Sequence, residues 1–338
     1  MQTHTPIITS SDCEGAGEVF TVSSDSSKVS TQQPQNGKPA IVEHFFKEPK
    51  YLTVSAQLHL EALAQGVGNV WTLSPTFRAE KSDTPRHLSE FYMLEAEMTF
   101  VNNMTFVMDV VEKMLRATAN ALTTSAVGKQ LLHTLEYKGP DAQTHISSLT
   151  PAELKKRWQA LQVNKWPRVT YQQAITKLQN AYANKAKFKV APSYEGGLQA
   201  EHERYLADKF GNGRPVFITH YPRNQKPFYM MPSTTDGKET VECFDLLVPD
   251  LCELVGGSMR EHRSEELIKR MREQGLLKDG DDQESISNLQ WYIDLRQYGS
   301  VSHGGFGLGF DRLLAYLSGV TNIRDVVAFP RWHGRCNA

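Results

Sequence analysis

Hydrophobic and polar residues alternate in two runs of the first third of the chain. The run VWTLSPTFRAE at residues 70–80 and the run EFYMLEAEMTFV at residues 90–101 are rich in aromatic and β-branched side chains. The segment KSDTPRHLS between them contains proline and aspartate, which favour turns. This pattern predicts a long antiparallel hairpin.

Apolar residues recur at helical spacing through the middle of the chain. Three groups show this spacing: Phe106, Val110, Met114 and Leu115; Leu154, Trp158 and Leu161; and Ala174, Ile175 and Leu178. Each group predicts an amphipathic helix. We therefore predict a helical insertion at about residues 102–212.

Short strand-like runs return after Gly213. They are PVFITHYP, PFYMM, VECFDLLV and CELVGGS, and helical patterns follow at residues 265–274 and 286–297. A glycine-punctuated strand, HGGFGLGF, and a helix, DRLLAYLSG, come last. Because the strands come in hairpins and do not alternate regularly with helices, we predict an α+β fold with a mostly antiparallel sheet flanked by helices.

Composition is that of an ordinary globular protein. The 338 residues are 40% hydrophobic and 22% charged, which suits one large domain over residues 1–338. Residues 23–40 are rich in Ser, Gln and Pro, and predict a surface loop. The four cysteines have no paired CxxC spacing, so we expect inert thiols and not a zinc site or disulfide framework. No apolar run approaches the roughly 18 residues of a membrane span.

The net charge of −1 excludes a general positive field of the kind that binds nucleic acid non-specifically. We therefore expect no DNA partner. Any contact with RNA must be local.

Charged residues crowd into the loop of the predicted hairpin. Five ionisable side chains lie within thirteen positions around a Thr-Pro turn: Arg78, Glu80, Arg86, His87 and Glu90. Two arginines near one turn can hold phosphate oxygens through charge-assisted hydrogen bonds of roughly 1.5 to 3 kcal/mol each. Phe91 follows and offers an aromatic face to a purine. The alternative is a solvated loop whose ion pairs contribute at most about 1 kcal/mol each.

Two carboxylates interrupt otherwise apolar strands. Asp245 and Glu253 lie in CFDLLVPDLCELVGGSMREHR, and burying both without partners would be costly. Mg²⁺ commonly binds through one or two carboxylates together with substrate phosphates. The alternative is a structural salt-bridge network with Arg260 or Arg263.

Four glycines in HGGFGLGF precede a helix that carries Arg312 in its first turn. Glycine lets a ligand approach the backbone closely. The string lacks the Walker lysine and does not fit GxGxxG followed by an acidic residue, so alone it indicates no particular ligand.

Taken in order, these clusters resemble the signatures of the class II aminoacyl-tRNA synthetases. THTPIITSSDCEGAGEVF resembles the end of motif 1 and its following loop, TFRAEKSDTPRHLSEFYMLEAEM resembles motif 2, and HGGFGLGFDRLLAYLSGVTNIRDVVAFPR resembles motif 3. Within that class, the sequence from Thr3 to Arg331 is most similar to asparaginyl-tRNA synthetases of the bacterial and organellar type. The resemblance implies the class II catalytic fold, ATP-dependent activation of asparagine, and its transfer to tRNA(Asn).

The resemblance implies an ATP site. Arg78 matches the motif 2 arginine that holds the α-phosphate and stabilises the transition state, and Arg312 matches the motif 3 arginine at the adenine. These two are the predicted catalytic residues. The other implied ATP contacts are Glu80 beside the adenine, Arg86 and His87 at the γ-phosphate, Phe91 stacked on the adenine, and Glu253 and Gly309.

The resemblance also implies contacts for the amino acid and the metal. Glu14 matches the loop glutamate that receives the α-ammonium group, with Ser55 and Gln57 beside it, and Arg260 matches the arginine that addresses the side-chain carbonyl. Asp245 and Glu253 match ligands of Mg²⁺.

Aspartate enzymes share most of these residues. A bacterial-type aspartate enzyme is expected to carry a lysine near Leu60, where this sequence reads QLHLE, which favours asparagine. An aspartyl-tRNA synthetase and an enzyme that amidates aspartate remain as alternatives. A non-catalytic paralogue is disfavoured, because both catalytic arginines and both metal carboxylates are present.

The resemblance further implies a homodimer, no membrane partner, and a location in the mitochondrial matrix or a bacterial-type cytoplasm. Members of the family carry an oligonucleotide-binding barrel that reads the anticodon and a long motif 1 helix, both of which would precede Gln2. We therefore expect a catalytic domain without the anticodon-binding domain.

Overall fold

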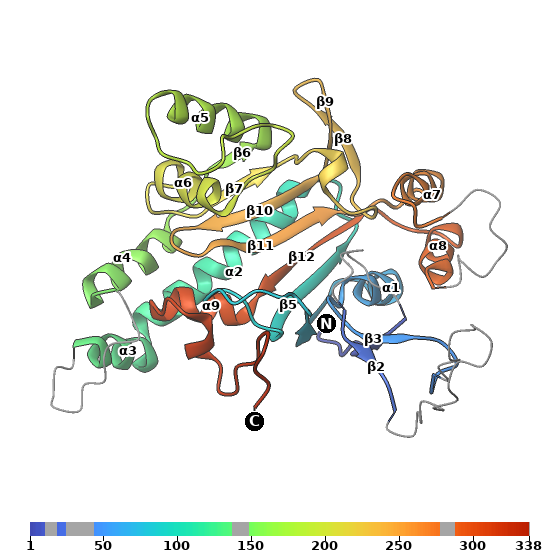
Figure 1. Ribbon diagram of the computed structural model, residues 1–338, viewed down its shortest axis with the longest axis horizontal. Helices are drawn as coiled ribbons and strands as arrows, with labels where there is room; N and C mark the ends of the chain where they lie inside the picture. The colour runs from blue at the N-terminus through green and yellow to red at the C-terminus, as the bar shows by residue number, and fades with distance from the viewer. Residues whose placement is uncertain (11–18, 25–43, 137–148, 278–287, 338) are drawn as a thin grey trace, which may run out of the picture.

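A seven-stranded sheet organises the computed structural model, which describes residues 1–10, 19–24, 44–136, 149–277 and 288–337 (Figure 1). The strand order is β4-β5-β12-β11-β10-β7-β6. The strands are β4 (Val70–Phe77), β5 (Glu90–Thr99), β6 (Arg168–Thr170), β7 (Val216–Thr219), β10 (Cys243–Val248), β11 (Cys252–Met259) and β12 (His303–Gly309). All neighbours are antiparallel except β6 and β7. The predicted α+β fold with a mostly antiparallel sheet is confirmed.

The predicted hairpin is formed by β4 and β5. Their register runs from Val70 opposite Glu97 to Phe77 opposite Glu90. Arg78 therefore begins the loop at the end of the hairpin, and Phe91 lies on the neighbouring strand.

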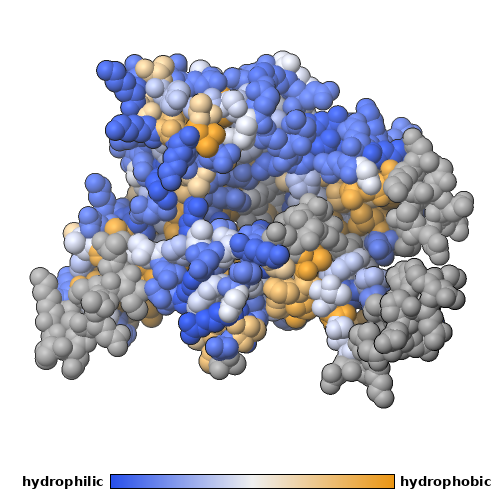
Figure 2. Space-filling model, viewed as in Figure 1, coloured by the Kyte–Doolittle hydropathy of each residue, from blue (hydrophilic) through white to orange (hydrophobic). Residues whose placement is uncertain are grey.

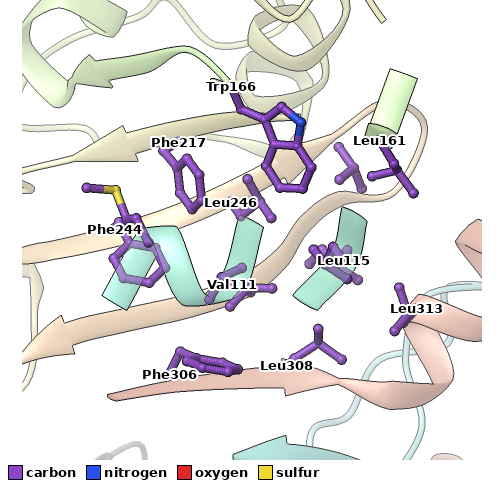
Figure 3. Close-up of a cluster of buried hydrophobic side chains, with 14 of the residues drawn as sticks. Val111, Leu115, Leu161, Trp166, Phe217, Phe244, Leu246, Phe306, Leu308 and Leu313 are labelled. Carbon is purple, nitrogen blue, oxygen red and sulfur yellow. The ribbon is translucent and has the colours of Figure 1, made fainter. Parts of the chain in front are cut away.

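One face of the sheet is covered by helices and holds the main hydrophobic core. These helices are α2 (Met104–Thr124), α4 (Pro151–Gln162) and α9 (Phe310–Ser318), and α3 (Ala126–Glu136) packs against them. Figure 3 shows side chains of this core: Val111, Leu115, Leu161, Trp166, Phe217, Phe244, Leu246, Phe306, Leu308 and Leu313. All of them are buried.

The buried stripe of α2 differs from the predicted one. Phe106 is 48% exposed, whereas Val107, Val111 and Leu115 are buried at intervals of four residues. Both stripes satisfy helical spacing, because the run is apolar on more than one side. The stripe that packs on the sheet becomes the buried one, and residue spacing alone does not show which stripe that is.

The other face of the sheet is covered only at its two sides. Helices α5 (Tyr171–Ala183) and α6 (Ala200–Phe210) cover β7 and β10 on one side. On the other side α1 (Gln57–Val67) packs on β4 and β5, and α8 (Gln290–Gln297) lies between α1 and α7 (Ser264–Glu273) (Figure 1). Cys243 and Leu247 of β10 join the core beneath α5 and α6. Because side chains alternate along a strand, Asp245 between them points to this same face.

Small elements complete the fold. The strands β1 (Ile8–Thr9), β2 (Thr21–Val22) and β3 (Lys50–Leu52) form a three-stranded sheet, and β8 (Pro232–Thr235) and β9 (Lys238–Val241) form a hairpin. Two short 3₁₀ helices are η2 (Arg223–Gln225) and η3 (Ile323–Val326). None of the helices in the described ranges is long and apolar enough to cross a membrane.

Two details of the sequence prediction are wrong. The run PFYMM is not a strand: it forms a turn, with one isolated bridge between Met230 and Arg260. Its proline lacks the N–H that a strand ladder needs. The predicted helical insertion also contains the strand β6, which was not predicted. Residues 25–40 of the predicted loop lie outside the described residues.

Glycine at position 305 is required by the packing of β12 against β5. A Cβ added to Gly305 would collide with the Glu97 carboxylate and with the Ala96 carbonyl oxygen. Gly66, inside α1, contrasts with it, because a Cβ there would meet no atom within 4 Å.

We expect Gly305→Ala to lower the free energy of unfolding by roughly 1 to 3 kcal/mol, since overpacking forces the neighbours to shift. Gly66→Ala should raise it by about 0.5 to 1 kcal/mol, because alanine has less backbone entropy to lose in a helix. Urea denaturation of both variants measures the two effects. A wild-type midpoint for Gly305→Ala would contradict the packing at this strand.

Candidate active site

Two adjoining cavities open on the partly covered face of the sheet. The larger cavity measures about 690 Å³ and the smaller one about 280 Å³. Arg78, Met93, Glu253 and Gly307 line both cavities. Arg78 therefore lies at the boundary between two compartments of one site.

The smaller cavity gathers the residues for which ATP contacts are predicted. Its lining includes Arg78, Glu80, Arg86, His87, Phe91, Glu253, Gly309 and Arg312. They come from the β4–β5 loop, β5, β11, β12 and α9. The structure thus brings all eight together, and their individual roles stay predictions.

Arginine guanidinium groups make the smaller cavity suitable for an anion. The Arg78 guanidinium carbon lies 5.7 Å from the centre of the Phe91 ring. Arg312, in the first turn of α9, donates from Nη1 to the Glu253 carbonyl oxygen at 2.5 Å. Arg86 donates from Nη1 to Cys252 Sγ at 3.3 Å. Three positive side chains thus line one cavity, two from the β4–β5 loop and one from α9.

His87 is held by hydrogen bonds inside the loop. Its Nδ1 lies 3.0 Å from the Ser82 hydroxyl and 2.5 Å from the Thr84 hydroxyl, and its Nε2 lies 3.5 Å from Glu80. Burial and the nearby positive charges lower the pKa of His87, although Glu80 opposes this shift. The imidazole therefore favours its neutral form and offers hydrogen bonds more than charge.

The C-terminal segment at residues 324–331 binds the β4–β5 loop, a feature that the sequence analysis missed. Arg324 donates to Asp83 at 2.9 Å, and Arg331 donates to Glu90 at 2.5 Å. The backbone N–H of Ser89 donates to the Arg331 carbonyl at 2.7 Å. About 240 residues separate each pair, so no local sequence pattern reports the contact.

The larger cavity gathers the residues predicted to bind the amino acid and the metal. Ser55, Gln57, Asp245, Glu253 and Arg260 line it, and Leu60 lies at its wall. Glu14, predicted to receive the α-ammonium group, lies outside the described residues. The position of Glu14 therefore stays a prediction.

Arg260 has its charge balanced within the protein. Its Nε and Nη2 donate to the Glu97 carboxylate at 3.1 to 3.3 Å, and Nη1 donates to the Ser258 hydroxyl at 2.7 Å. Burial alone would lower the pKa of Arg260, but Glu97 and Glu61 outweigh it and raise that pKa. The guanidinium has five N–H groups, so one on each terminal nitrogen remains for a ligand.

The cavity contains carboxylates that the sequence analysis did not single out. Glu95 accepts hydrogen bonds from the Ser55 hydroxyl at 2.5 Å and from the Ala56 backbone N–H at 2.8 Å. Glu95 and Glu97 alternate with apolar residues along β5 and face the cavity. Their period of two in EFYMLEAEM was the signal that could have identified them.

Glu61 of α1 is the centre of a buried network below the cavity. It accepts from Arg296 Nη2 at 2.6 Å and from the Tyr292 hydroxyl at 2.7 Å, and His303 Nε2 lies 3.1 Å away. Gln57 donates to its other oxygen at 3.0 Å. Burial would raise the pKa of Glu61, but Arg296 and His303 outweigh it, so this pKa lies below its usual range. Glu61 is therefore ionised, and its second oxygen orients Gln57.

Asp245 and Glu253 face a common space above Gly256. A Cβ added to Gly256 would lie 3.2 Å from Glu253 Oε1 and 3.6 Å from Asp245 Oδ1. The alternative pairing with Arg260 or Arg263 is wrong, because these arginines pair with Glu97 and Glu261. Lys226 pairs with Asp245 instead, at 3.0 Å.

The electrostatics of these carboxylates fit a divalent cation. Burial and the negative charge of Asp245 raise the pKa of Glu253, a repulsion that a cation would relieve. Within the described ranges, no three His, Cys, Asp or Glu side chains are grouped to hold a metal by themselves. A metal ion held by Asp245 and Glu253 would therefore need oxygens of a substrate, as Mg²⁺ commonly does.

The glycines of β12 differ in what surrounds them. A Cβ at Gly304 would lie 2.9 Å from both Met259 Sδ and the Ser258 carbonyl oxygen, so this glycine serves packing. Gly307 lines both cavities, and a Cβ there would lie 2.7 Å from Met93 Cε, the end of a flexible side chain. At Gly309 the nearest atom would be Arg312 Cβ at 3.5 Å, an ordinary contact. That a ligand approaches the backbone at Gly307 and Gly309 stays a prediction.

Comparison with known proteins places the site in a family context. The family model described as tRNA synthetases class II (D, K and N) matches residues 1–333. The mitochondrial asparagine–tRNA ligase of Saccharomyces cerevisiae is 43% identical over 96% of this chain, and the asparagine–tRNA ligase of Clostridium tetani is 42% identical over 98%. This chain covers 62% and 65% of their lengths.

Solved structures give the same picture. The asparaginyl-tRNA synthetase of Pyrococcus horikoshii, complexed with asparaginyl-adenylate, superposes with a TM-score of 0.77 and 30% identity. That alignment covers all of this chain and 64% of the other. The aspartyl-tRNA synthetase of Entamoeba histolytica aligns with a TM-score of 0.60 and 28% identity, over 85% of this chain and 53% of that one.

Glu203, in the first turn of α6, is a further carboxylate on which the charges of the site act. Burial and the negative charges of Glu253 and Asp245 raise the pKa of Glu203 to about 8. The folded protein therefore binds this proton more tightly than the unfolded chain does. Between about pH 4.5 and pH 8, ionisation of Glu203 opposes folding, so its contribution becomes less favourable as the pH rises.

We expect Glu203→Gln to be more stable than the wild type at pH 8.5, by roughly 2 kcal/mol, and nearly equal to it at pH 5. Denaturant unfolding in EDTA at both pH values measures the difference. Glu201→Gln is the matched control on the same helical turn. Its carboxylate accepts from two backbone N–H groups, which lower its pKa, so this variant should lose stability at both pH values. An equal effect of Glu203→Gln at pH 5 and 8.5 would refute the assignment.

Proposed function

Because the chain belongs to the class II tRNA synthetases of the D, K and N family, we propose that it activates asparagine with ATP and transfers the asparaginyl group to tRNA(Asn). The observation that carries this proposal is the pair of cavities that meet at Arg78. One has three arginines that suit the phosphates and base of ATP, and the other contains Arg260, whose charge Glu97 already balances. The curated relatives named asparagine–tRNA ligase support the same activity.

The proposed first step needs no proton transfer. A carboxylate oxygen of asparagine attacks the α-phosphorus of ATP, the bond to pyrophosphate breaks, and asparaginyl-adenylate forms. Catalysis then requires positioning and charge stabilisation, which arginines supply without a general base. Arg78, at the boundary of the cavities, would hold the α-phosphate. Arg86 and His87 would contact the γ-phosphate, and Phe91 and Arg312 would enclose the adenine.

The amino acid would occupy the larger cavity. Glu14, Ser55 and Gln57 would surround its α-ammonium group, and Arg260 would donate to its side-chain carbonyl. Because Glu97 already balances Arg260, a second carboxylate at this place would lack a counter-charge, whereas a neutral amide needs none. Leu60, where a bacterial-type aspartate enzyme is expected to have lysine, lines this cavity. Both features favour asparagine over aspartate.

Asp245 and Glu253 would hold Mg²⁺ together with phosphate oxygens of ATP. The ion would neutralise charge that develops on the phosphates during adenylation. Lys226 keeps Asp245 in place through its ion pair. In the second step, the 3′-hydroxyl of the terminal ribose of tRNA(Asn) would attack the asparaginyl carbonyl; the new ester bond forms as the bond to the phosphate breaks and AMP leaves.

We also propose a homodimer in the mitochondrial matrix, with a bacterial-type cytoplasm as the alternative location. The mitochondrial yeast relative and the clostridial relative support these two locations. For the dimer, exposed aromatic side chains offer a surface: Trp71 and Tyr92 are 39% and 47% exposed, and Phe100 is 78% exposed. Trp71 lies on β4, an edge strand of the sheet.

Amino-acid-dependent exchange between ATP and pyrophosphate tests the proposed activation. Exchange with asparagine and not with aspartate is the expected result. Exchange with aspartate would indicate an aspartyl-tRNA synthetase, and AMP release that needs aspartate and ammonia would indicate the amidating enzyme. No exchange with any of these substrates would contradict the proposed activity of this chain.

We predict that Arg78→Ala reduces the exchange rate by roughly 10² or more, because it removes one preorganised contact to the reacting phosphate. Arg157→Ala serves as the control, since Arg157 pairs with Asp250 and is absent from the lining of both cavities. It should leave the rate near that of the wild type. A wild-type rate for Arg78→Ala would remove this residue from the proposed mechanism.

We predict that Trp71→Arg converts the dimer into a monomer, because a charge at the centre of an apolar contact is left without a partner. Light scattering after gel filtration should give twice the chain mass of 38.1 kDa for the wild type and the chain mass for the variant. Val127→Arg, at an exposed residue of α3, is the matched control and should stay dimeric. A monomeric wild type would contradict the proposed dimer.

A further inference from the structure

The nearly neutral chain contains a strongly basic part. Residues 151–215, which include α4, α5 and α6, carry 12 Lys and Arg against 5 Asp and Glu, a net charge of +7. The whole chain has 37 against 38, so the remaining residues have 25 against 33, a net charge of −8. Figure 2 shows that the surface over α5 and α6, at the upper left, is mostly hydrophilic. Positive potential is therefore concentrated on one side of the molecule.

The most regular basic feature lies between α5 and α6. Lys185, Lys187 and Lys189 alternate with Ala186 and Phe188, in a segment at residues 184–190 that we name the lysine loop. All three lysines are exposed, whereas Ala186 and Phe188 are half-buried. The lysines consequently project from one structured segment toward solvent.

Aromatic packing and hydrogen bonds hold the lysine loop in place. The Phe188 ring lies 5.1 Å from the His202 ring and 5.3 Å from the Tyr205 ring, both on α6. The Glu201 carboxylate accepts from the backbone N–H groups of Lys189 and Val190 at 2.9 and 2.8 Å. The loop is therefore anchored to the first turns of α6 by its apolar side and its backbone.

The ammonium groups of the loop are available to a partner. Across the described ranges, no carboxylate forms a salt bridge with Lys185, Lys187 or Lys189. Glu201, the nearest acidic neighbour in these contacts, already binds backbone N–H groups. The charge of Lys189 acts on Glu201, whereas no salt bridge holds the ammonium groups of Lys185 and Lys187 within the described ranges. Because exposed charges contribute little to folding stability, these lysines are free to serve binding.

The first turn of α6 connects the lysine loop to the smaller cavity. The Ala200 carbonyl accepts from Cys252 Sγ at 3.6 Å, and Cys252 in turn accepts from Arg86 at 3.3 Å. Glu203, two residues after the anchoring Glu201, is close enough to Glu253 and Asp245 for their negative charges to raise its pKa. The first turn of α6 thus contacts both the lysine loop and the wall of the smaller cavity, where the phosphates of ATP are proposed to lie.

We propose that the lysine loop binds the phosphate backbone of RNA, in the acceptor arm whose 3′ end enters the site. This inference rests on the proposed function, which requires the end of an RNA chain at the cavity. Lysine contacts to phosphates release counterions and carry no base specificity, so the loop would add affinity and orientation but not choice of sequence. RNA is favoured over an anionic membrane because the loop is joined, through the first turn of α6, to a cavity that must admit a nucleic-acid end.

The test compares a triple variant, Lys185→Gln, Lys187→Gln and Lys189→Gln, with a control of equal charge loss, Lys113→Gln, Lys129→Gln and Lys269→Gln. The control lysines are exposed and lie on α2, α3 and α7. Fluorescence anisotropy gives the Kd for a tRNA(Asn) transcript and for a hairpin of its acceptor arm, between 50 and 300 mM salt. Exchange between ATP and pyrophosphate is measured on the same preparations.

The loop variant should bind both RNAs about 10-fold or more weakly at low salt, and its plot of log K against log salt should be less steep by about 1 for each lost phosphate contact. The control should bind as the wild type does, and exchange with asparagine should be unchanged in both variants. Three results would overturn the inference. They are an unchanged Kd and slope for the loop variant, an equal loss of RNA affinity in the control, and a loss of affinity for the tRNA but not for the hairpin. If anionic vesicles bind the wild type more tightly than the hairpin does, the partner of the loop is a membrane and not RNA.

These outcomes separate the inference from the function on which it rests. If asparagine-dependent exchange is present and RNA binding is insensitive to the loop, only the inference fails. If exchange is absent in the wild type, the proposed function fails, and the RNA measurements still decide whether the loop binds phosphates.

Discussion

A ligand cavity lined by ionised groups is stable only if their charges are balanced before the ligand arrives. Glu61 meets this constraint, because its oxygens bind Arg296, Tyr292 and Gln57 while His303 lies beside it. Arg260 and Glu97 form the next pair toward the cavity. These contacts join α1, α8, β5, β11 and β12 at one point. Losing one partner would leave a buried charge, a change that typically costs 3 to 5 kcal/mol.

The same sheet supports two cavities of different electrostatic character. In the smaller one, two arginines of the β4–β5 loop and one of α9 line the cavity, which suits an anionic ligand. In the larger one, Arg260 pairs with Glu97, Asp245 pairs with Lys226, and Glu95 accepts from the Ser55 hydroxyl. The balanced Arg260 suits a zwitterion with a neutral side chain. Arg78 lies at the boundary because the β4–β5 register ends at Phe77. The chemistry of the site therefore follows from strand register as well as from residue type.

Local patterns predicted the fold, and they singled out residues that the structure brings to the two cavities. The β4–β5 hairpin was visible because alternation is a local signal, and the clusters around Arg86, Asp245 and Arg312 were visible as charges in unusual places. The residues that pair with these clusters were not visible in the sequence. Arg296 is 235 residues from Glu61, and Lys226 reaches Asp245 from the end of η2, before the run that was predicted as a strand. A contact between distant residues produces no pattern in the neighbouring sequence, whereas a helix or a strand produces a periodic one.

Binding of two non-hydrolysable adenylate analogues, one asparaginyl and one aspartyl, tests the specificity of the site most directly, because it requires neither turnover nor tRNA. Calorimetry with this chain should show that the asparaginyl analogue binds at least about 10²-fold more tightly, since the aspartyl carboxylate would face a guanidinium already balanced by Glu97. Equal affinities, or tighter binding of the aspartyl analogue, would contradict a site built for asparagine.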